Sequence, residues 1–127
     1  MRLTAHWNGG YHITIPVRDF ELAIDEPPRY GGQDRGPMPT EMLLASLAGC
    51  FAAAVYHAAR KRDVTLPDLS VDIEGEYAGL RFATLRLSVH SSLPRSELEP
   101  LVELARGYCY VSNTLLTPPK LDVVIAD

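Results

Sequence analysis

One stretch of the sequence decides the fold: residues 36–62, GPMPTEMLLASLAGCFAAAVYHAARKR. Its middle, residues 42–59, carries no charged side chain, and a basic cluster closes it. Pro39 suits the first turn of a helix, where its missing N–H is not needed. Glu41 near the start and the basic cluster at the end both match the charge preference of the helix dipole. The stretch therefore predicts one helix from about residue 39 to about residue 62.

A helix that is apolar on every side is either a core helix or a membrane span. A span needs about 20 strongly apolar residues, whereas this run is shorter, rich in alanine and interrupted by serine, glycine, tyrosine and histidine. We therefore expect a long central helix surrounded by the rest of the protein, and no membrane association. The three-four spacing of a helix places the following residues on one face: Leu43, Leu47, Cys50, Ala54 and His57.

The whole chain has 127 residues, of which 46% are hydrophobic, which predicts a single domain over residues 1–127 with a substantial core. A net charge of −4 and a pI near 5.5 argue against a nucleic-acid-binding protein. No apolar run follows the first charged residue, so we expect no signal peptide and a cytoplasmic location. In that compartment the two cysteines are expected to be thiols or a redox pair.

The segments before the central helix predict three strands, at residues 3–7, 11–17 and 20–24. Asn8-Gly9-Gly10 between the first two is a strong hairpin signal, because these residues tolerate positive φ. Residues 25–38 then form a connecting loop rich in proline and glycine.

After the helix, alternating apolar residues predict a strand over residues 69–77 and an antiparallel partner over residues 85–89. Ser96 and Glu99 have the spacing of a capping box, which predicts a second helix there with Pro100 in its first turn. Residues 121–126 predict a last strand. The order βββ-α-ββ-α-β indicates an α+β fold with a mainly antiparallel sheet.

Cys50 lies on the central helix and Cys109 near the end of the second helix, and spacing alone leaves their role open. Two buried small hydrophobes are the commoner situation for free cysteines. We expect no metal site, since there is no Cys-x-x-Cys and the four histidines do not fall at ligand spacings. His57 lies two turns from Cys50, which is too far for a Cys–His nucleophile pair within one helix.

Two patterns resemble the OsmC/Ohr family of osmotically inducible and organic-hydroperoxide-resistance proteins: G-P-x-P-T-E-x-L-L-x-x-L-x-G-C at residues 36–50 and C-x-V-S-N-T-L at residues 109–115. The resemblance implies an intertwined homodimer with reactive cysteines near the subunit interface. It also implies that Cys50 attacks the peroxide, that Cys109 resolves the resulting sulfenic acid, and that an external dithiol restores both. Such a site needs no metal or organic cofactor.

The sequence departs from the hydroperoxide-resistance branch at residues that activate the first cysteine. That branch has glutamate directly after the helix-start proline, where this chain has Thr40 followed by Glu41. Glu41 is therefore either a catalytic residue or a helix-start residue. The branch also has an arginine after its glycine pair, where this chain has Tyr11, so candidates for the activating cation are Arg18, Arg29 and Arg35. Tyr110 replaces a proline that often follows the second cysteine, which makes the chain more similar to OsmC-like relatives of less settled activity.

The main functional hypothesis is a cysteine-based peroxidase that reduces organic hydroperoxides in oxidative stress defence. Leu47, Phe51 and Tyr108 would give it an apolar lining that favours alkyl hydroperoxides. The alternative is a non-catalytic OsmC-like dimer that binds a small apolar ligand or partner at the subunit interface, and a third reading is a purely structural dimer. A guanidinium beside Cys50, and sulfur atoms of Cys50 and Cys109 within disulfide reach, would favour the first.

Overall fold

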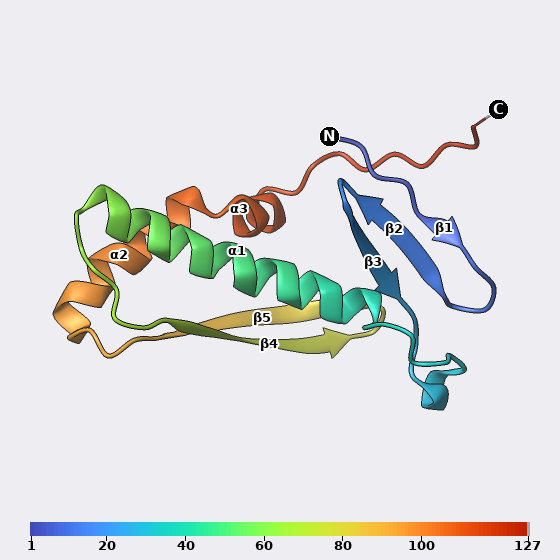
Figure 1. Ribbon diagram of the computed structural model, residues 1–127, viewed down its shortest axis with the longest axis horizontal. Helices are drawn as coiled ribbons and strands as arrows, with labels where there is room; N and C mark the ends of the chain where they lie inside the picture. The colour runs from blue at the N-terminus through green and yellow to red at the C-terminus, as the bar shows by residue number, and fades with distance from the viewer. Residues whose placement is uncertain (127) are drawn as a thin grey trace. The chain divides into compact units, whose positions relative to one another are not determined.

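The structure, a computed structural model, describes residues 1–126, which form two compact units, Met1–Leu43 and the chain from Leu44 onward. The α+β class is confirmed, while the single domain over residues 1–127 stays a prediction. In chain order (Figure 1) the elements are β1 (His6–Trp7), β2 (Ile13–Val17), β3 (Phe20–Ile24), the 3₁₀ helix η1 (Pro28–Tyr30), α1 (Pro39–Lys61), β4 (Ser70–Ala78), β5 (Arg81–His90), α2 (Arg95–Tyr108) and α3 (Tyr110–Leu116).

The N-terminal unit is a three-stranded antiparallel sheet in the order β1-β2-β3. The hairpin predicted at Asn8-Gly9-Gly10 is present: Gly9 and Gly10 have φ angles of 96° and 55°, and the N–H of Asn8 donates to the carbonyl oxygen of His12 at 2.9 Å. β1 is shorter than predicted and pairs only with the first two residues of β2.

A buried carboxylate organises the loop that follows β3. Asp25 is 1% exposed, and its oxygens accept the backbone N–H groups of Glu26 at 2.7 Å, Gln33 at 3.3 Å and Arg35 at 3.2 Å. Burying a charged group is tolerable when it is fully hydrogen-bonded. The predicted connecting loop is therefore a folded element wrapped around one side chain.

The central helix α1 begins and ends within one residue of its predicted bounds. Its buried side chains are Leu47, Phe51, Ala54, Val55, Ala58 and Ala59. The single chain covers only part of α1, and other positions on its surface, including Leu43 and Tyr56, are exposed. With a mean hydropathy of 1.6 the helix is long and apolar enough to cross a membrane, a property that it shares with core helices of soluble proteins.

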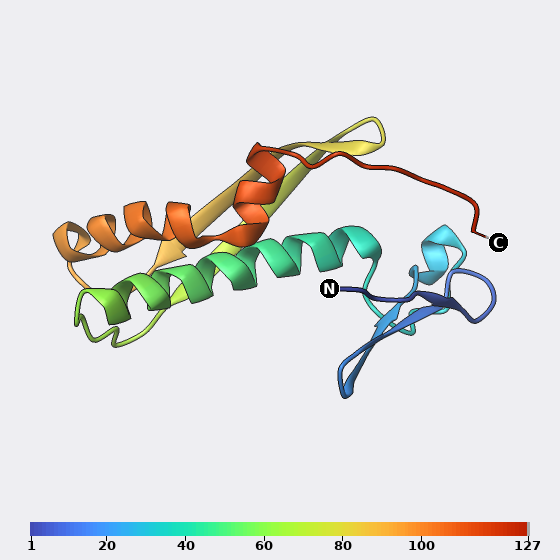
Figure 2. The ribbon, with the colours of Figure 1, turned by 90° about the horizontal axis from the view of Figure 1, so that it is seen from above.

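In the C-terminal unit, β4 and β5 form a long antiparallel hairpin, and α1 and α2 lie beside each other against it (Figures 1 and 2). The turn between the strands contains Gly79 at φ 62°, a conformation that glycine adopts without strain. From α2 the fully buried residues Leu101, Ala105 and Cys109 enter the same core as the buried face of α1. The two cysteine-bearing segments thus share one hydrophobic core.

Three details of the C-terminal half differ from the sequence predictions. α2 begins at Arg95 with Pro94 as its N-cap, so Pro100 lies inside the helix beyond its first turn. The predicted capping box is wrong: Glu99 instead accepts a 2.8 Å hydrogen bond from Arg95 Nε one turn earlier. Residues 121–126 are not a strand but an extended segment that runs away from the helices (Figure 2). Their large apolar side chains are 82–100% exposed, because within the described residues this segment pairs with no other strand.

Candidate functional site

Cys109 lies at the junction between two helices. It caps the C-terminus of α2 and the N-terminus of α3, with extended dihedral angles of φ −81° and ψ 102°. Its sulfur accepts a hydrogen bond from the backbone N–H of Ser112 at 3.5 Å, and the residue is fully buried. The sulfur therefore takes the place that a serine or aspartate oxygen usually occupies at a helix start.

Cys50 lies halfway along α1, is half-buried, and packs against the core cluster to which Cys109 belongs. The Cys50 thiol also acts on the Cys109 thiol and lowers its pKa. Both cysteines are free thiols. The structure thus brings together the two cysteines that the sequence singled out, although 58 residues separate them in the chain.

The surroundings of Cys109 favour its thiolate. Burial by itself raises the pKa of the Cys109 thiol, but hydrogen bonds from the Ser112 hydroxyl, the Ser112 N–H, the Cys50 thiol and the Val111 N–H outweigh it and hold this pKa below its usual value. Hydrogen bonds to the charged form of an acid stabilise that form. In the structure the Ser112 hydroxyl donates to the Cys109 carbonyl oxygen at 3.3 Å, and it acts on the sulfur by rotating towards it when the thiolate forms.

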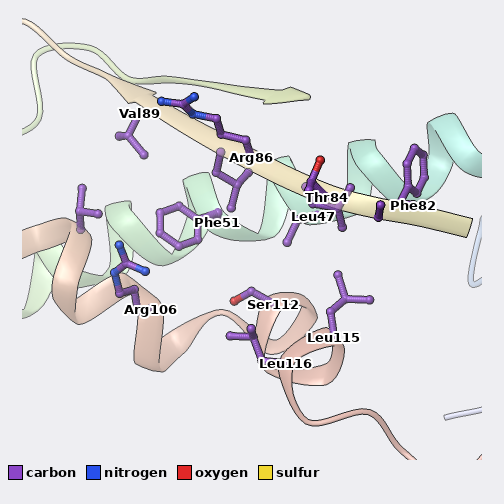
Figure 3. Close-up of a pocket in the computed structure, with 14 residues that line it drawn as sticks. Leu47, Phe51, Phe82, Thr84, Arg86, Val89, Arg106, Ser112, Leu115 and Leu116 are labelled. Carbon is purple, nitrogen blue, oxygen red and sulfur yellow. The ribbon is translucent and has the colours of Figure 1, made fainter. Parts of the chain in front are cut away.

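A mainly apolar groove of about 680 Å³ opens between α1, β5, α2 and α3 (Figure 3). Leu47 and Phe51 line it, as the sequence predicted, together with Ser112 and the guanidinium-bearing Arg86 and Arg106. Tyr108, the third residue predicted for the lining, lies elsewhere. Its ring packs edge-on against His57, with the ring centroids 4.7 Å apart, and is partly exposed.

Glu41 makes a helix-start contact. Its Oε1 accepts the backbone N–H of Met38, the residue before α1, at 2.8 Å. This is one half of a capping box, in which the side chain of the third helical residue reaches back to the N-cap. Of the two roles left open for Glu41, the geometry favours the helix start.

The three arginines suggested as activating cations all belong to the N-terminal unit. Arg18 occupies the β2–β3 turn with φ 54°, and its guanidinium lies 5.2 Å from the centre of the Phe20 ring. Arg29 lies over the ring of Tyr30 at 4.9 Å, and the backbone of Arg35 donates to Asp25. The activating role of Arg18 stays a prediction.

Sequence reasoning did not single out three residues of this region: Ser112, Arg86 and Arg106. For Ser112 a signal was present, because it follows Cys109 by three residues, which is the spacing at which an N-cap side chain meets a backbone N–H. No comparable signal marked the two arginines. They reach the groove from β5 and α2, and only the tertiary fold brings these elements together.

Comparison with known proteins agrees with this geometry. A family model described as "OsmC-like protein" matches residues 31–124. A hydroperoxide reductase of Mycoplasma genitalium is 26% identical over 121 residues, covering 89% of this chain and 84% of that protein. Organic hydroperoxide resistance protein OhrB of Bacillus subtilis is 24% identical over 122 residues, covering 88% of this chain and 86% of that protein.

Among solved structures, an OsmC-like protein from Mycoplasma pneumoniae has the same fold. The TM-score is 0.76 at 21% identity, covering 92% of this chain and 87% of that chain. The family model also includes the segment with both cysteines, which the structure brings together. With well over half of its length matched by that model, the chain belongs to the family of OsmC-like proteins.

Proposed function

We propose that this protein is a thiol-dependent peroxidase that reduces organic hydroperoxides, with Cys50 as the attacking and Cys109 as the resolving cysteine. The observation that carries the proposal is the packing of two free thiols of unequal exposure in one core, Cys50 half-buried and Cys109 fully buried. Hydroperoxide-related names among the relatives support the same reaction class.

In the first step, the Cys50 thiolate attacks one oxygen of the hydroperoxide and the O–O bond breaks. The alkoxide leaves and takes up a proton to become the alcohol, and Cys50 becomes a sulfenic acid. The Cys109 thiolate then attacks the Cys50 sulfur, forming the disulfide and releasing hydroxide, which is protonated to water. The hydrogen bonds that favour the Cys109 thiolate supply the reactive form for this second step. An external dithiol reduces the disulfide and is itself oxidised.

The substrate class follows from the groove beside the cysteine pair. Ser112 belongs both to the groove lining and to the hydrogen-bond partners of Cys109, so the groove reaches the cysteine region. Its apolar side chains, Leu47 and Phe51 among them, suit an alkyl group better than they suit water or hydrogen peroxide. The same groove also supports the alternative function, binding of a small apolar ligand without catalysis.

We further propose a cytoplasmic, intertwined homodimer. One argument is the apolar surface that the single chain leaves open: Leu43 and Tyr56 on α1 are exposed, as is the C-terminal segment with Leu121, Val123, Val124 and Ile125. Large exposed apolar surfaces mark interaction sites, and obligate dimers bury about 2,000 Å² or more. The family resemblance supports the same assembly.

The test is to give each reduced variant one equivalent of an alkyl hydroperoxide and follow its thiols by mass spectrometry. The wild type should form one disulfide between Cys50 and Cys109. Cys109→Ser should stop at a sulfenic acid on Cys50 that over-oxidises as peroxide increases. Cys50→Ser is the matched variant, because it makes the same sulfur-to-oxygen change at the other cysteine. It should consume no peroxide. Equal consumption by Cys50→Ser and wild type would refute a catalytic Cys50 and favour the binding function.

A further inference from the structure

A backbone hydrogen bond in this structure favours negative charge on the sulfur of Cys109. The backbone N–H of Ser112 donates to Cys109 Sγ at 3.5 Å, and the Ser112 hydroxyl lies on the same residue, where it donates to the Cys109 carbonyl oxygen at 3.3 Å. Together with Val111 and Cys50, Ser112 lowers the pKa of the Cys109 thiol. Cys50, in contrast, lies in the middle of α1, where the N–H groups are committed to the helix.

The two sulfurs also differ in access. Cys109 is 0% exposed and is enclosed by the core with Leu101 and Ala105, whereas Cys50 is half-buried. A nucleophile from outside therefore approaches Cys50 more readily. In thiol–disulfide exchange, the rate depends on which sulfur can be reached and on the pKa of the thiol that leaves, a lower pKa leaving faster. The greater exposure of Cys50 and the lowered pKa of the Cys109 thiol therefore both favour attack on the Cys50 sulfur.

We propose that the reductant of the Cys50–Cys109 disulfide attacks Cys50, that Cys109 departs as the thiolate, and that Ser112 is the positioning residue that holds this thiolate. The inference rests on the proposed function and adds which sulfur of the disulfide the reductant attacks. A thiolate of the dithiol donor forms an S–S bond with Cys50 while the Cys50–Cys109 bond breaks. The donor's second thiolate then attacks the donor sulfur of this mixed disulfide, releasing Cys50 as a thiolate and leaving the donor oxidised. The two cysteine thiolates are in equilibrium with protons of the solvent.

Ser112 suits this role because its two donors act independently. Replacement by alanine removes the hydroxyl but keeps the backbone N–H on the sulfur. Thr114 offers a matched control on the same helix: its hydroxyl donates to the Tyr110 carbonyl oxygen at 2.7 Å, and it is exposed. Ser112→Ala and Thr114→Ala therefore each delete one α3 hydroxyl, but only the first deletes a partner of Cys109.

The experiment uses full-length protein oxidised with diamide, so it does not depend on peroxide turnover. The oxidised protein is mixed with the monothiol 2-mercaptoethanol, quenched in acid within milliseconds to seconds, and mapped by peptide mass spectrometry. The adduct is expected on Cys50. Ser112→Ala should slow formation of this adduct on the order of three- to tenfold, Thr114→Ala should leave it unchanged, and Ser112→Thr should restore it.

A second readout separates positioning from a general structural effect. The thiol pKa of Cys109, measured by ultraviolet titration in the Cys50→Ser background, should rise in Ser112→Ala and stay unchanged in Thr114→Ala. An adduct predominantly on Cys109 would overturn the proposed direction of attack. Equal exchange rates in Ser112→Ala and Thr114→Ala would overturn the role of Ser112. Neither result bears on peroxide consumption by Cys50, which the peroxide treatment of the cysteine variants tests separately.

Discussion

Oxidation of the cysteine pair should stabilise the folded protein measurably. The disulfide would close a loop of about 60 residues, for which the chain-entropy model gives about 14 cal/mol/K, or about 4 kcal/mol at room temperature. In the reduced protein Cys50 already packs against the core cluster that contains Cys109, so both ends of the bond lie in one core. Against this gain, the Ser112 N–H would lose part of its hydrogen bond to the Cys109 sulfur, at a cost on the order of 1 kcal/mol. We therefore expect a net stabilisation of about 2–4 kcal/mol.

Urea unfolding followed by far-ultraviolet circular dichroism measures this difference. With a urea slope of about 2 kcal/mol/M, the midpoint of the oxidised protein should lie about 1–2 M above that of the reduced protein. Both forms must be compared at one protomer concentration, because dimerisation makes the midpoint concentration-dependent. The double variant Cys50→Ser/Cys109→Ser, treated with the same oxidant, should show no shift. An unchanged or lower midpoint for fully oxidised protein would mean that the native fold strains the bond, and the reasoning would fail.

Three further predictions follow from single contacts and surfaces. Glu41→Ala should lower the free energy of unfolding by about 0.5–1 kcal/mol, because it loses the contact with Met38, and Glu41→Gln should lower it by less, because it keeps an acceptor. Thermal melts of the two variants measure these changes. Loss of peroxide consumption in a stably folded Glu41→Gln would instead indicate that Glu41 is catalytic. For Asp25, burial raises the pKa, but three backbone N–H groups and His12 outweigh burial and lower it. Its contribution to stability is thus present above the unfolded-state pKa of about 3.9 and is lost as the pH falls through the lower folded-state pKa; Asp25→Asn should remove this part of the acid dependence of unfolding. Sedimentation at micromolar concentration should show a homodimer, and a stable folded monomer would contradict the proposed assembly.

The parts of the fold that could be predicted are those fixed by local chemistry. α1 is bounded by a proline that suits a first turn and by a basic cluster, and both ends follow from neighbouring residues alone. The first hairpin is likewise fixed by Gly9 and Gly10, because few other residues adopt positive φ readily. The cysteine pairing, in contrast, came from resemblance, since nothing in spacing alone brings residue 109 to the middle of α1.

The predictions that were wrong depended on partners outside the local segment. Residues 121–126 have the composition of a strand, but a strand forms only beside another strand, and in the described residues this segment pairs with none. The capping box at Ser96 has the correct spacing, yet Pro94 starts the helix earlier, where the N–H groups of Glu97 and Leu98 already bond to its carbonyl oxygen. Pro100 consequently lies in the interior of α2.

The non-helical conformation of Cys109 lets its side chain be buried in the core while its sulfur accepts backbone hydrogen bonds. If α2 continued unbroken into α3, the N–H groups of Val111 and Ser112 would bond to carbonyl oxygens four residues earlier and would not be available to the sulfur. The break at Cys109 frees these donors, while the preceding turns of α2 still place its side chain in the core with Leu101 and Ala105. Tyr110 then occupies the first position of α3, where a backbone N–H has no intrahelical partner. A proline at that position, which the family resemblance implies, would be equally compatible, so the departure at Tyr110 leaves the hydrogen bonds to Cys109 intact.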